Sequence, residues 1–238
     1  MKNDKSYIAV DIETTGLNAK LDKIIEIGAV KVIDGQITER FQTLVNPHRG
    51  LLDQTELLTG ITADMLEGAP GIEEVIGALV DFCEEGLPLL GHRIIFDFSF
   101  LKRAAVNRKL AFERDGIDTL KLCRHFMPDG EKKNLAAACA FYGIAREQSH
   151  RAFADAVDAH LLFQALWERH GRYEPEEFAE KPLIYKVKRE QPASKKQKEG
   201  LRYLLKYHKI DLPVQIDYLS RNEISRITDK IILQYGRI

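Results

Sequence analysis

Two acidic residues, Asp11 and Glu13, end the first apolar run of the chain, which begins at Tyr7. Side chains alternate along a strand, so residues two apart point to the same side, where one cation could bind both carboxylates. Without a cation such carboxylates repel and the pKa of one of them rises, whereas a divalent ion reverses that interaction. The pair by itself is more typical of solvated acids at the end of a strand. Other residues must therefore decide whether it forms a site.

Further candidate residues stand at two predicted helix starts. Asp97 follows a short apolar strand and begins a predicted helix, where backbone amides and the helix dipole favour an anion. His150 lies in a predicted loop, and Asp155 lies in the first turn of the helix that follows. Helical spacing places Asp155 on the inward side, and we expect Asp158 to point away. Each motif alone is also typical of an ordinary helix start.

The elements that must position these side chains follow from apolar patterns and turn signals. Three β-rich runs open the chain, and Asp34-Gly35, between the second and third, is a strong hairpin signal. Residues 57–62 are predicted to form a loop. The later predicted elements are strands at 88–92 and 117–120 and helices at 72–85, 96–109, 134–142 and 153–167. This order predicts an α/β fold with a mixed β-sheet and helices on its faces.

The composition indicates a globular protein of one large domain, or of one domain with a small appendage, because 238 residues can bury a full core. No apolar stretch approaches the roughly 20 residues that span a bilayer, and the first apolar run already carries acids. We therefore expect a cytoplasmic protein without a membrane partner. The three cysteines lack C-x-x-C spacing, which argues against a zinc site and a disulfide framework.

The net charge of −1 hides an asymmetry along the chain. Residues 1–171 carry 20 Lys and Arg against 26 Asp and Glu, whereas residues 172–238 carry 15 against 10. The basic residues are densest from Lys186 to Lys209, a distribution that suits a polyanion partner. A solvated linker followed by a charged helix face is an equally good interpretation.

The same asymmetry suggests the domain boundaries. We predict a main domain at 1–171, a charged linker at 172–192 and a small basic helical module at 193–238. Ser194-x-x-Gln197 and Ser220-x-x-Glu223 fit the capping box and predict the starts of two helices in this module. Because about 45 residues bury only a small core, the module is either marginally stable or docked on a partner.

Five spaced motifs together resemble those of the DnaQ-like exonucleases of the DEDDh type, which share the ribonuclease H-like fold. The motifs are Asp11-Ile12-Glu13-Thr14-Thr15-Gly16-Leu17, the strand from Ile24 to Val30, Leu58-Thr59-Gly60-Ile61-Thr62, Phe96-Asp97 and the spacing from His150 to Asp155. The resemblance covers residues 5–170. It is closest to the proofreading exonucleases of bacterial replicative polymerases, including the exonuclease segment of PolC-type enzymes. The family usually has Asn after the histidine of the Gly91-His92 stretch, where this chain has Arg93; the departure concerns substrate contacts and leaves the carboxylates intact.

The resemblance implies a two-metal catalytic site. Asp11, Glu13 and Asp155 would hold one Mg²⁺ or Mn²⁺, Asp11 and Asp97 would hold a second, and His150 would be the general base. The implied enzyme is a 3′→5′ exonuclease that hydrolyses phosphodiester bonds from the 3′ end of DNA, in proofreading or repair. Its products would be nucleoside 5′-monophosphates.

The resemblance also implies a pocket for the end of the strand. The turn after Glu13 would bind the 3′-OH, and apolar side chains would wedge against or stack on the terminal base. The residues implied to contact substrate are Thr14, Thr15, Gly16, Leu17, Ile61, His92 and Phe96.

Two other interpretations stay open. The same site serves exonucleases that trim RNA, because the metal chemistry attacks the phosphodiester and is indifferent to the 2′-OH. The chain could also be a nucleic-acid-binding or scaffold protein that keeps the fold without turnover. We expect a single-stranded DNA 3′ end as partner, and a proofreading role would require a separate polymerase or another replication or repair protein.

Overall fold

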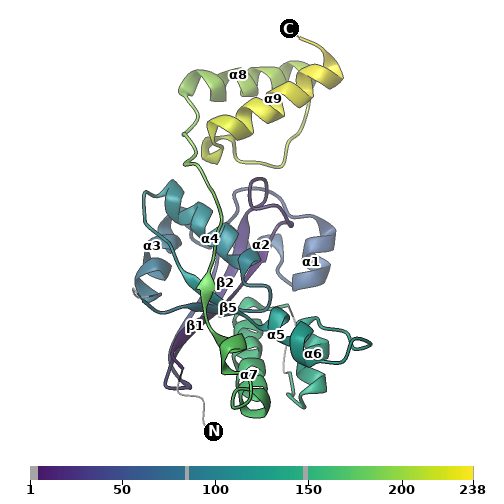
Figure 1. Ribbon diagram of the computed structural model, residues 1–238. Coiled ribbons are helices and arrows are strands. Elements are labelled where there is room, and N and C mark those ends of the chain that lie inside the picture. Colours follow the sequence, from purple (N-terminus) through teal and green to yellow (C-terminus); the bar gives the residue numbers. More distant parts are fainter. Residues whose placement is uncertain (1–4, 84–85, 147–149, 238) are drawn as a thin grey trace. The chain divides into compact units, whose positions relative to one another are not determined.

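A mixed β-sheet organises most of the computed structural model, which describes residues 5–83, 86–146 and 150–237. Figure 1 shows this part of the chain, in which the strand order is β3-β2-β1-β4-β5-β6. The strands are β1 (Tyr7–Thr14), β2 (Ile24–Ile33), β3 (Gln36–Leu44), β4 (Leu89–Gly91), β5 (Asp115–Asp118) and β6 (Lys181–Pro182). β1, β4 and β5 are parallel, whereas β2, β3 and β6 run antiparallel to their neighbours. The predicted mixed sheet, with three antiparallel strands at its start, is confirmed.

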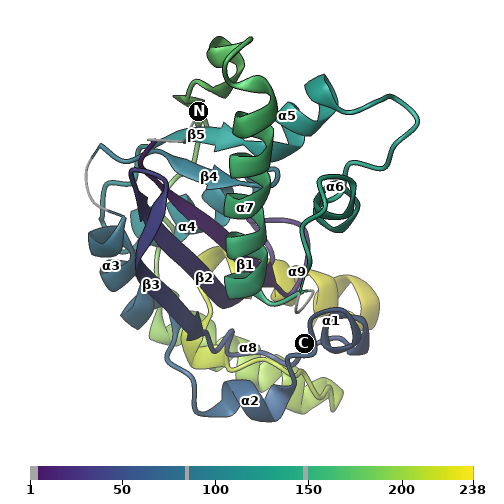
Figure 2. The same ribbon diagram turned by 90° about the horizontal axis from the view of Figure 1, so that it is seen from below.

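Helices cover both faces of this sheet. In Figure 2, α7 crosses one face and α4 lies behind the other. The helices of this part are α1 (Asp53–Thr59), α2 (Ala63–Glu67), α3 (Ile72–Phe82), α4 (Ile95–Asn107), α5 (Thr119–Phe126), α6 (Leu135–Phe141) and α7 (Ala152–His170), followed by the 3₁₀ turn η1 (Pro175–Phe178). No helix in the described residues combines the length and the apolar composition that crossing a bilayer requires.

The alternation of side chains along β1 decides where its acids point. Ile8, Val10 and Ile12 pack in one core with side chains of α3 and α4. Tyr7 and Ala9 pack in the other core with side chains of α5, α6 and α7. Continuing the alternation puts residues 11 and 13 on the face that α7 covers. One apolar pattern therefore builds both cores and directs the two carboxylates toward the helix that carries Asp155.

Two sequence predictions about local structure are wrong in part, because residues 60–62 do form a loop and residues 117–118 do lie in a strand. Residues 57–62, predicted to form a loop, begin inside α1, which ends where Gly60 adopts a left-handed φ of 67°. The strand predicted at 117–120 ends at Asp118, because its side chain accepts the Leu120 amide at 3.0 Å and caps α5. Short helices of this kind lack the long apolar periodicity on which the prediction relied.

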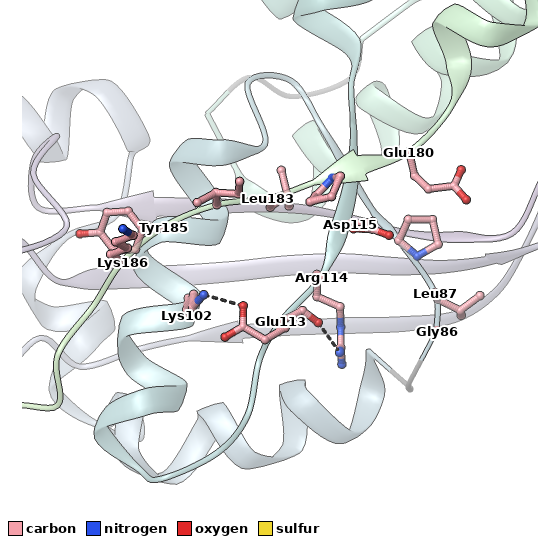
Figure 3. Close-up of a pocket in the computed structure, with 13 residues that line it drawn as sticks. Gly86, Leu87, Lys102, Glu113, Arg114, Asp115, Glu180, Leu183, Tyr185 and Lys186 are labelled. Atoms are coloured by element: carbon pink, nitrogen blue, oxygen red, sulfur yellow. Dashed lines mark hydrogen bonds and ion pairs between the residues drawn. The ribbon is translucent and has the colours of Figure 1, made fainter.

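A hollow of about 420 Å³ lies at the β5–β6 edge of the sheet (Figure 3). Its walls include Lys102 and Glu113, whose Nζ and Oε2 atoms are 2.6 Å apart, together with Arg114 and Lys186. Positive and negative side chains are balanced around it, and none of the candidate catalytic residues contributes to its lining. It is therefore separate from the acids at the end of β1.

The described chain divides into a larger unit, residues 1–47 and 51–187, and a smaller unit, residues 48–50 and 188–238. The smaller unit contains α8 (Lys195–His208), the 3₁₀ turn η2 (Ile216–Tyr218) and α9 (Arg221–Tyr235). Both predicted capping boxes are confirmed, because Ser194 with Gln197 and Ser220 with Glu223 make the reciprocal hydrogen bonds. The smaller unit has its own core, formed by Leu201, Leu204, Leu205, Leu219, Ile224 and Ile231.

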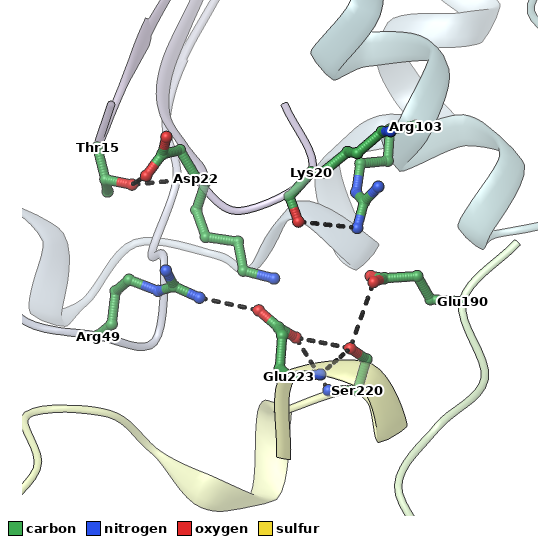
Figure 4. A network of polar contacts seen from close by, with 9 residues as sticks. Thr15, Lys20, Asp22, Arg49, Arg103, Glu190, Ser220 and Glu223 are labelled. Atoms are coloured by element: carbon green, nitrogen blue, oxygen red, sulfur yellow. Dashed lines mark hydrogen bonds and ion pairs between the residues drawn. The ribbon is translucent and has the colours of Figure 1, made fainter. Parts of the chain in front are cut away.

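A short segment from early in the sequence belongs to this smaller unit. The Arg49 guanidinium lies 2.9 Å from the Glu223 carboxylate, and Ser220 links Glu223 to Glu190 (Figure 4). The Gly50 amide donates to the Pro213 carbonyl at 2.7 Å. The core of the smaller unit is thus bordered by residues 48–50, which sequence spacing alone does not indicate.

Candidate active site

Asp11 and Glu13 lie at the carboxyl end of β1, on the face covered by α7. Burial raises the pKa of Asp11 well above its ordinary value, and the nearby charges of Asp97 and Glu13 raise it further. Burial, followed by the Asp155 charge, raises the pKa of Glu13 to about 7. These shifts mean that the folded chain holds its acids in a place where negative charge is unfavourable without a counter-ion.

Gly28 allows α7 to approach these acids. It pairs with Asp11 across β1 and β2. A Cβ atom built on Gly28 would lie 2.1 Å from the backbone nitrogen of Phe153 and 2.3 Å from the carbonyl carbon of Ala152. No side chain fits there, so only glycine lets the first turn of α7 lie directly against β2. That contact brings Asp155 to the carboxylates of β1.

Glu26 fixes the start of the same helix. Its carboxylate is fully buried and accepts the Ala152 amide at 3.0 Å. The Arg151 guanidinium binds it through Nε and a terminal nitrogen, the latter at 2.8 Å, and Gln42 donates to it at 3.3 Å. An anion here satisfies a free amide at the helix N-terminus and complements the helix dipole. Glu26 is thus a positioning residue for α7.

The structure brings Glu13, His150 and Asp155 together. One ligand atom from each of the three lies within 4.8 Å of the other two. His150 is exposed and has a left-handed φ of 59°. It immediately precedes Arg151, the N-cap residue of α7. Asp155 is buried, and burial raises its pKa while Arg146 opposes the rise. This cluster joins β1 to the start of α7, although Glu13 lies more than 130 residues before His150 and Asp155 in the sequence.

Asp97 comes from the first turn of α4, as predicted. Its Oδ1 accepts the Ile12 amide at 3.1 Å, so it lies against the end of β1. It is 3% exposed, and burial raises its pKa although the amides of Asp97 and Ile12 oppose the rise. Its charge is also the largest charge contribution to the raised pKa of Asp11. Asp97 therefore adds a fourth carboxylate, near Asp11, to those of Asp11, Glu13 and Asp155.

Arg146 was not identified from the sequence. Its guanidinium binds the carboxylates of both Asp155 and Asp158. The expectation that Asp158 points away is wrong: the side chain is 5% exposed, because residues three apart on a helix share a face. The Asp-x-x-Asp spacing signals this shared face, but the sequence does not identify Arg146, in the segment before α7, as the partner of both acids. In the structure Arg146 supplies the positive charge nearest to Asp155.

Hydrogen bonds within the protein hold His92 and the backbone of Arg93 in place. Nε2 of His92 donates to the Lys133 carbonyl at 2.8 Å, Nδ1 lies 3.0 Å from the Thr119 hydroxyl, and burial lowers the His92 pKa. Arg93 has a left-handed φ of 74°, and its amide donates to Asp118 at 2.9 Å. Asn adopts this conformation with less strain than other non-glycine residues, which explains why Asn suits this position.

The turn after Glu13 uses several polar groups internally. The Thr15 amide donates to the Lys23 carbonyl at 2.9 Å, and the Thr14 hydroxyl donates to the Gly16 carbonyl at 2.6 Å. The Thr15 hydroxyl also lies 3.5 Å from Asp22 (Figure 4). A 3′-OH bound at this turn would therefore meet a backbone that is already ordered.

The apolar residues implied to contact a base differ in exposure. Leu17 is 87% exposed beside the turn and can meet a ligand directly. Phe96 is partly buried and packs on Phe100, with ring centroids 5.1 Å apart. Ile61 is fully buried against Ile25 and Leu66, so a contact to a base would require that cluster to open.

The donor set fits a hard divalent cation. Carboxylate oxygens are the preferred ligands of Mg²⁺ and Mn²⁺, and four carboxylates converge here. Burial and neighbouring negative charges raise the pKa of all four, so positive charge at this place would favour their ionised forms. Asp11, Glu13 and Asp155 could hold one ion, and Asp11 with Asp97 a second.

Comparison with known families agrees with this geometry. The profile of the family RNase T, described as exonuclease, matches residues 8–163, which contain all four acids and His150. The chain belongs to the DnaQ-like exonuclease family. The predicted resemblance is thus confirmed, and the family profile ends before residue 188, where the main segment of the smaller unit begins.

PolC-type DNA polymerases III are among the relatives of this exonuclease domain. The Clostridium perfringens protein is 39% identical over 153 residues, which cover 64% of this chain and 10% of the relative. The Bacillus subtilis protein is 38% identical over 167 residues, which cover 68% of this chain and 12% of the relative. The chain thus spans about a tenth of the length of these polymerases.

Solved structures of exonucleases share the fold. Exonuclease X in complex with 5′ overhanging duplex DNA is 27% identical, with a TM-score of 0.57 over 73% of this chain and 97% of that one. Escherichia coli exonuclease I in complex with a dT13 oligonucleotide is 16% identical, with a TM-score of 0.64 over 72% of this chain and 43% of that one. The predicted ribonuclease H-like fold is confirmed.

Proposed function

We propose that the chain is a metal-dependent 3′→5′ exonuclease that removes nucleotides from single-stranded DNA ends and releases nucleoside 5′-monophosphates. The observation that carries the proposal is the convergence of Glu13, His150 and Asp155, with Asp11 beside them, at the carboxyl end of β1. Family membership and the DNA in the exonuclease X and exonuclease I structures support DNA as substrate.

The carboxylates would hold the cations. When bound, two such ions would supply water activation and would neutralise charge on the scissile phosphate and the leaving 3′-oxygen. The charges of Asp97, Glu13 and Asp155 all raise the pKa of Asp11, which therefore lies near each of these acids, and the Ile12 amide fixes the Asp97 carboxylate. The chain's contribution at these positions is to preorganise the oxygen ligands before substrate arrives.

His150 would take the proton of the attacking water. The water oxygen forms a bond to phosphorus as the bond from phosphorus to the 3′-oxygen breaks, and the leaving oxygen takes a proton from solvent. A histidine suits this step near neutral pH because its ordinary pKa is about 6.5. His150 is exposed and close to Glu13 and Asp155, so it can reach a water at the cluster.

Degradation of a 5′-labelled single-stranded DNA with Mg²⁺ or Mn²⁺ tests the proposal. We expect a ladder that shortens from the 3′ end, and its loss in Asp11→Asn, which keeps the size of the side chain but removes a charged metal ligand. Asp81→Asn is the matched control, because Asp81 is an exposed acid near the end of α3 and should leave the ladder unchanged.

The same assay separates the alternatives. Faster shortening of an RNA strand of the same sequence would make the chain an RNA-trimming exonuclease. Shortening from the 5′ end would contradict the proposed polarity. If folded, metal-bound protein shortens neither strand, the proposal fails and a nucleic-acid-binding role replaces it.

A further inference from the structure

The outer face of α8 in the smaller unit presents aromatic rings to solvent. The helix packs its leucines, Leu201 among them, into the core of this unit. With 3.6 residues per turn, residues 196, 203, 206 and 207 fall on the opposite side of the helix. There Tyr203 is 61% exposed and Tyr207 is 58% exposed. Exposed rings in such proximity are typical of an interaction surface.

The rings form a continuous row that reaches α9. The centroids of Tyr203 and Tyr207 are 6.5 Å apart, those of Tyr207 and His208 are 5.0 Å apart, and those of His208 and Tyr235 are 5.5 Å apart. Tyr235, on α9, is itself 50% exposed. Because α8 and α9 pack side by side within this unit (Figure 1), the row is a feature of the folded pair of helices. Within this row, Tyr203 and Tyr207 are the exposed rings on the outer face of α8, so each can offer its ring to a planar group.

Positive charge accompanies this row. Residues 195–209 contain six Lys and Arg and a single acid, Glu199. Two of the six, Lys198 and Arg202, contact Asp217. Lys196 and Lys206 are exposed on the same face as the tyrosines, and neither forms an ion pair with an acid in the described chain. Their charge is therefore available to a polyanion.

We propose that this surface, defined by Lys196, Tyr203, Lys206 and Tyr207, binds single-stranded nucleic acid. Unpaired bases stack on the tyrosine rings, and the lysines contact the phosphates. A duplex offers the phosphates but keeps its bases stacked inside, so it would use the lysines without the rings. This proposal extends the proposed function to a second binding surface. It rests on that function only in taking DNA as the bound single strand. The family profile ends at residue 163, so the surface is not part of the matched exonuclease domain.

Binding without turnover provides the test. The full-length Asp11→Asn protein in EDTA is titrated into a fluorescent oligothymidylate of about 15 nucleotides, and anisotropy gives the affinity. We expect Tyr203→Ala combined with Tyr207→Ala to weaken binding at least about tenfold, because each stacked base contributes substantially. The two Tyr→Phe substitutions should keep the affinity, since they keep the rings. Tyr173→Ala, at a tyrosine of the larger unit that is 78% exposed, is the matched control and should bind like the parent.

Salt dependence tests the lysines separately. Each phosphate contact with a single strand contributes about 0.7 to the slope of log affinity against log salt. Lys196→Gln combined with Lys206→Gln should reduce that slope by about 1.4. Lys109→Gln combined with Lys181→Gln, two exposed lysines of the larger unit, should leave it unchanged.

These binding measurements test the proposed surface independently of the exonuclease activity. An affinity that survives the double Tyr→Ala change, or falls equally in Tyr173→Ala, overturns the proposal, as does equal weakening by the Tyr→Phe pair. Far-ultraviolet circular dichroism checks that α8 remains folded, which is expected because both tyrosines lie outside the leucine core. The oligothymidylate is not cut in these titrations, so ring-dependent binding supports the surface even if the degradation assay fails.

Discussion

At the scale of single residues, the carboxylates around Asp11 are the groups that most need a counter-ion. Burial and mutual repulsion raise the pKa of every one of them. Arg146 neutralises part of this charge at Asp155 and Asp158, whereas no described cation pairs with Asp11. The residues that would hold metal therefore carry a cost in the metal-free protein.

That cost predicts the pH dependence of metal-free stability. The pKa of Glu13 rises from 4.5 to about 7, so the folded state binds this proton more tightly than the unfolded chain. Stability is therefore highest below pH 4.5 as far as this group is concerned, and it falls as the pH rises toward 7. Urea unfolding in EDTA at several pH values measures this, and the free energy of unfolding should be lower at pH 8 than at pH 5.5.

Two variants test whether Glu13 causes this decline in stability with rising pH. Glu13→Gln should flatten the decline, and Glu168→Gln, at an exposed position on α7, should leave it as in the parent. Added Mg²⁺ should restore stability more at pH 8 than at pH 5.5, because it binds the ionised acids. A metal-free stability that increases between these two pH values would contradict the interpretation.

A substitution at His150 tests proton transfer separately from metal binding. We expect His150→Ala to lower kcat about 10²- to 10⁴-fold while Mn²⁺ binding, followed by calorimetry, is retained, because the carboxylate oxygens remain. His125→Ala is the control, since His125 is exposed and pairs with Glu174 away from the cluster. Unchanged turnover in His150→Ala would refute its role as general base.

At the scale of elements, the contact of α7 with β2 builds the site. Gly28→Ala would force a Cβ into the backbone of Ala152 and Phe153, and flexible side-chain movement cannot relieve that clash. We expect a loss of about 3 kcal/mol or more in stability, together with loss of activity. Gly77→Ala in α3 is the matched control, because its new Cβ would have no atom within 4 Å apart from its chain neighbours and the backbone of its own helix. Alanine should gain about 1 kcal/mol there as the better helix former.

Chemical denaturation followed by the single-stranded DNA assay measures both variants. If Gly28→Ala is as stable and as active as the parent, close packing of α7 on β2 is not what positions Asp155. If Gly77→Ala also loses activity, the effect does not depend on the contact between α7 and β2.

At the scale of the whole molecule, each of the two units has its own apolar core. Deleting residues 188–238 should therefore leave the larger unit folded, with kcat at saturating DNA within about twofold of the parent. Substrate binding should weaken and its salt dependence should flatten, because the basic α8 is removed. Steady-state kinetics over a range of salt concentrations measures both effects. Unchanged affinity and salt slope would instead make the smaller unit a docking element for another protein.

The sequence by itself determined the local features of this protein. Alternation in β1 placed Asp11 and Glu13 on one side, and helix-start signals placed Asp97 and Asp155 in first turns. The two serine capping boxes were likewise predicted and found. Such features depend on residues a few positions apart, so neighbouring side chains and backbone rules are enough to predict them. Grouping these distant motifs into one site relied on their resemblance to the exonuclease family.

Only the tertiary structure decided which distant residues support that site. Arg146 binds Asp155 and Asp158, and Glu26 holds the start of α7. His92 proves to be fixed by Thr119 and the Lys133 carbonyl. These partners come from separate loops and strands and are brought together by packing on the sheet. No spacing in the sequence encodes that proximity, because it depends on how whole elements fit against one another.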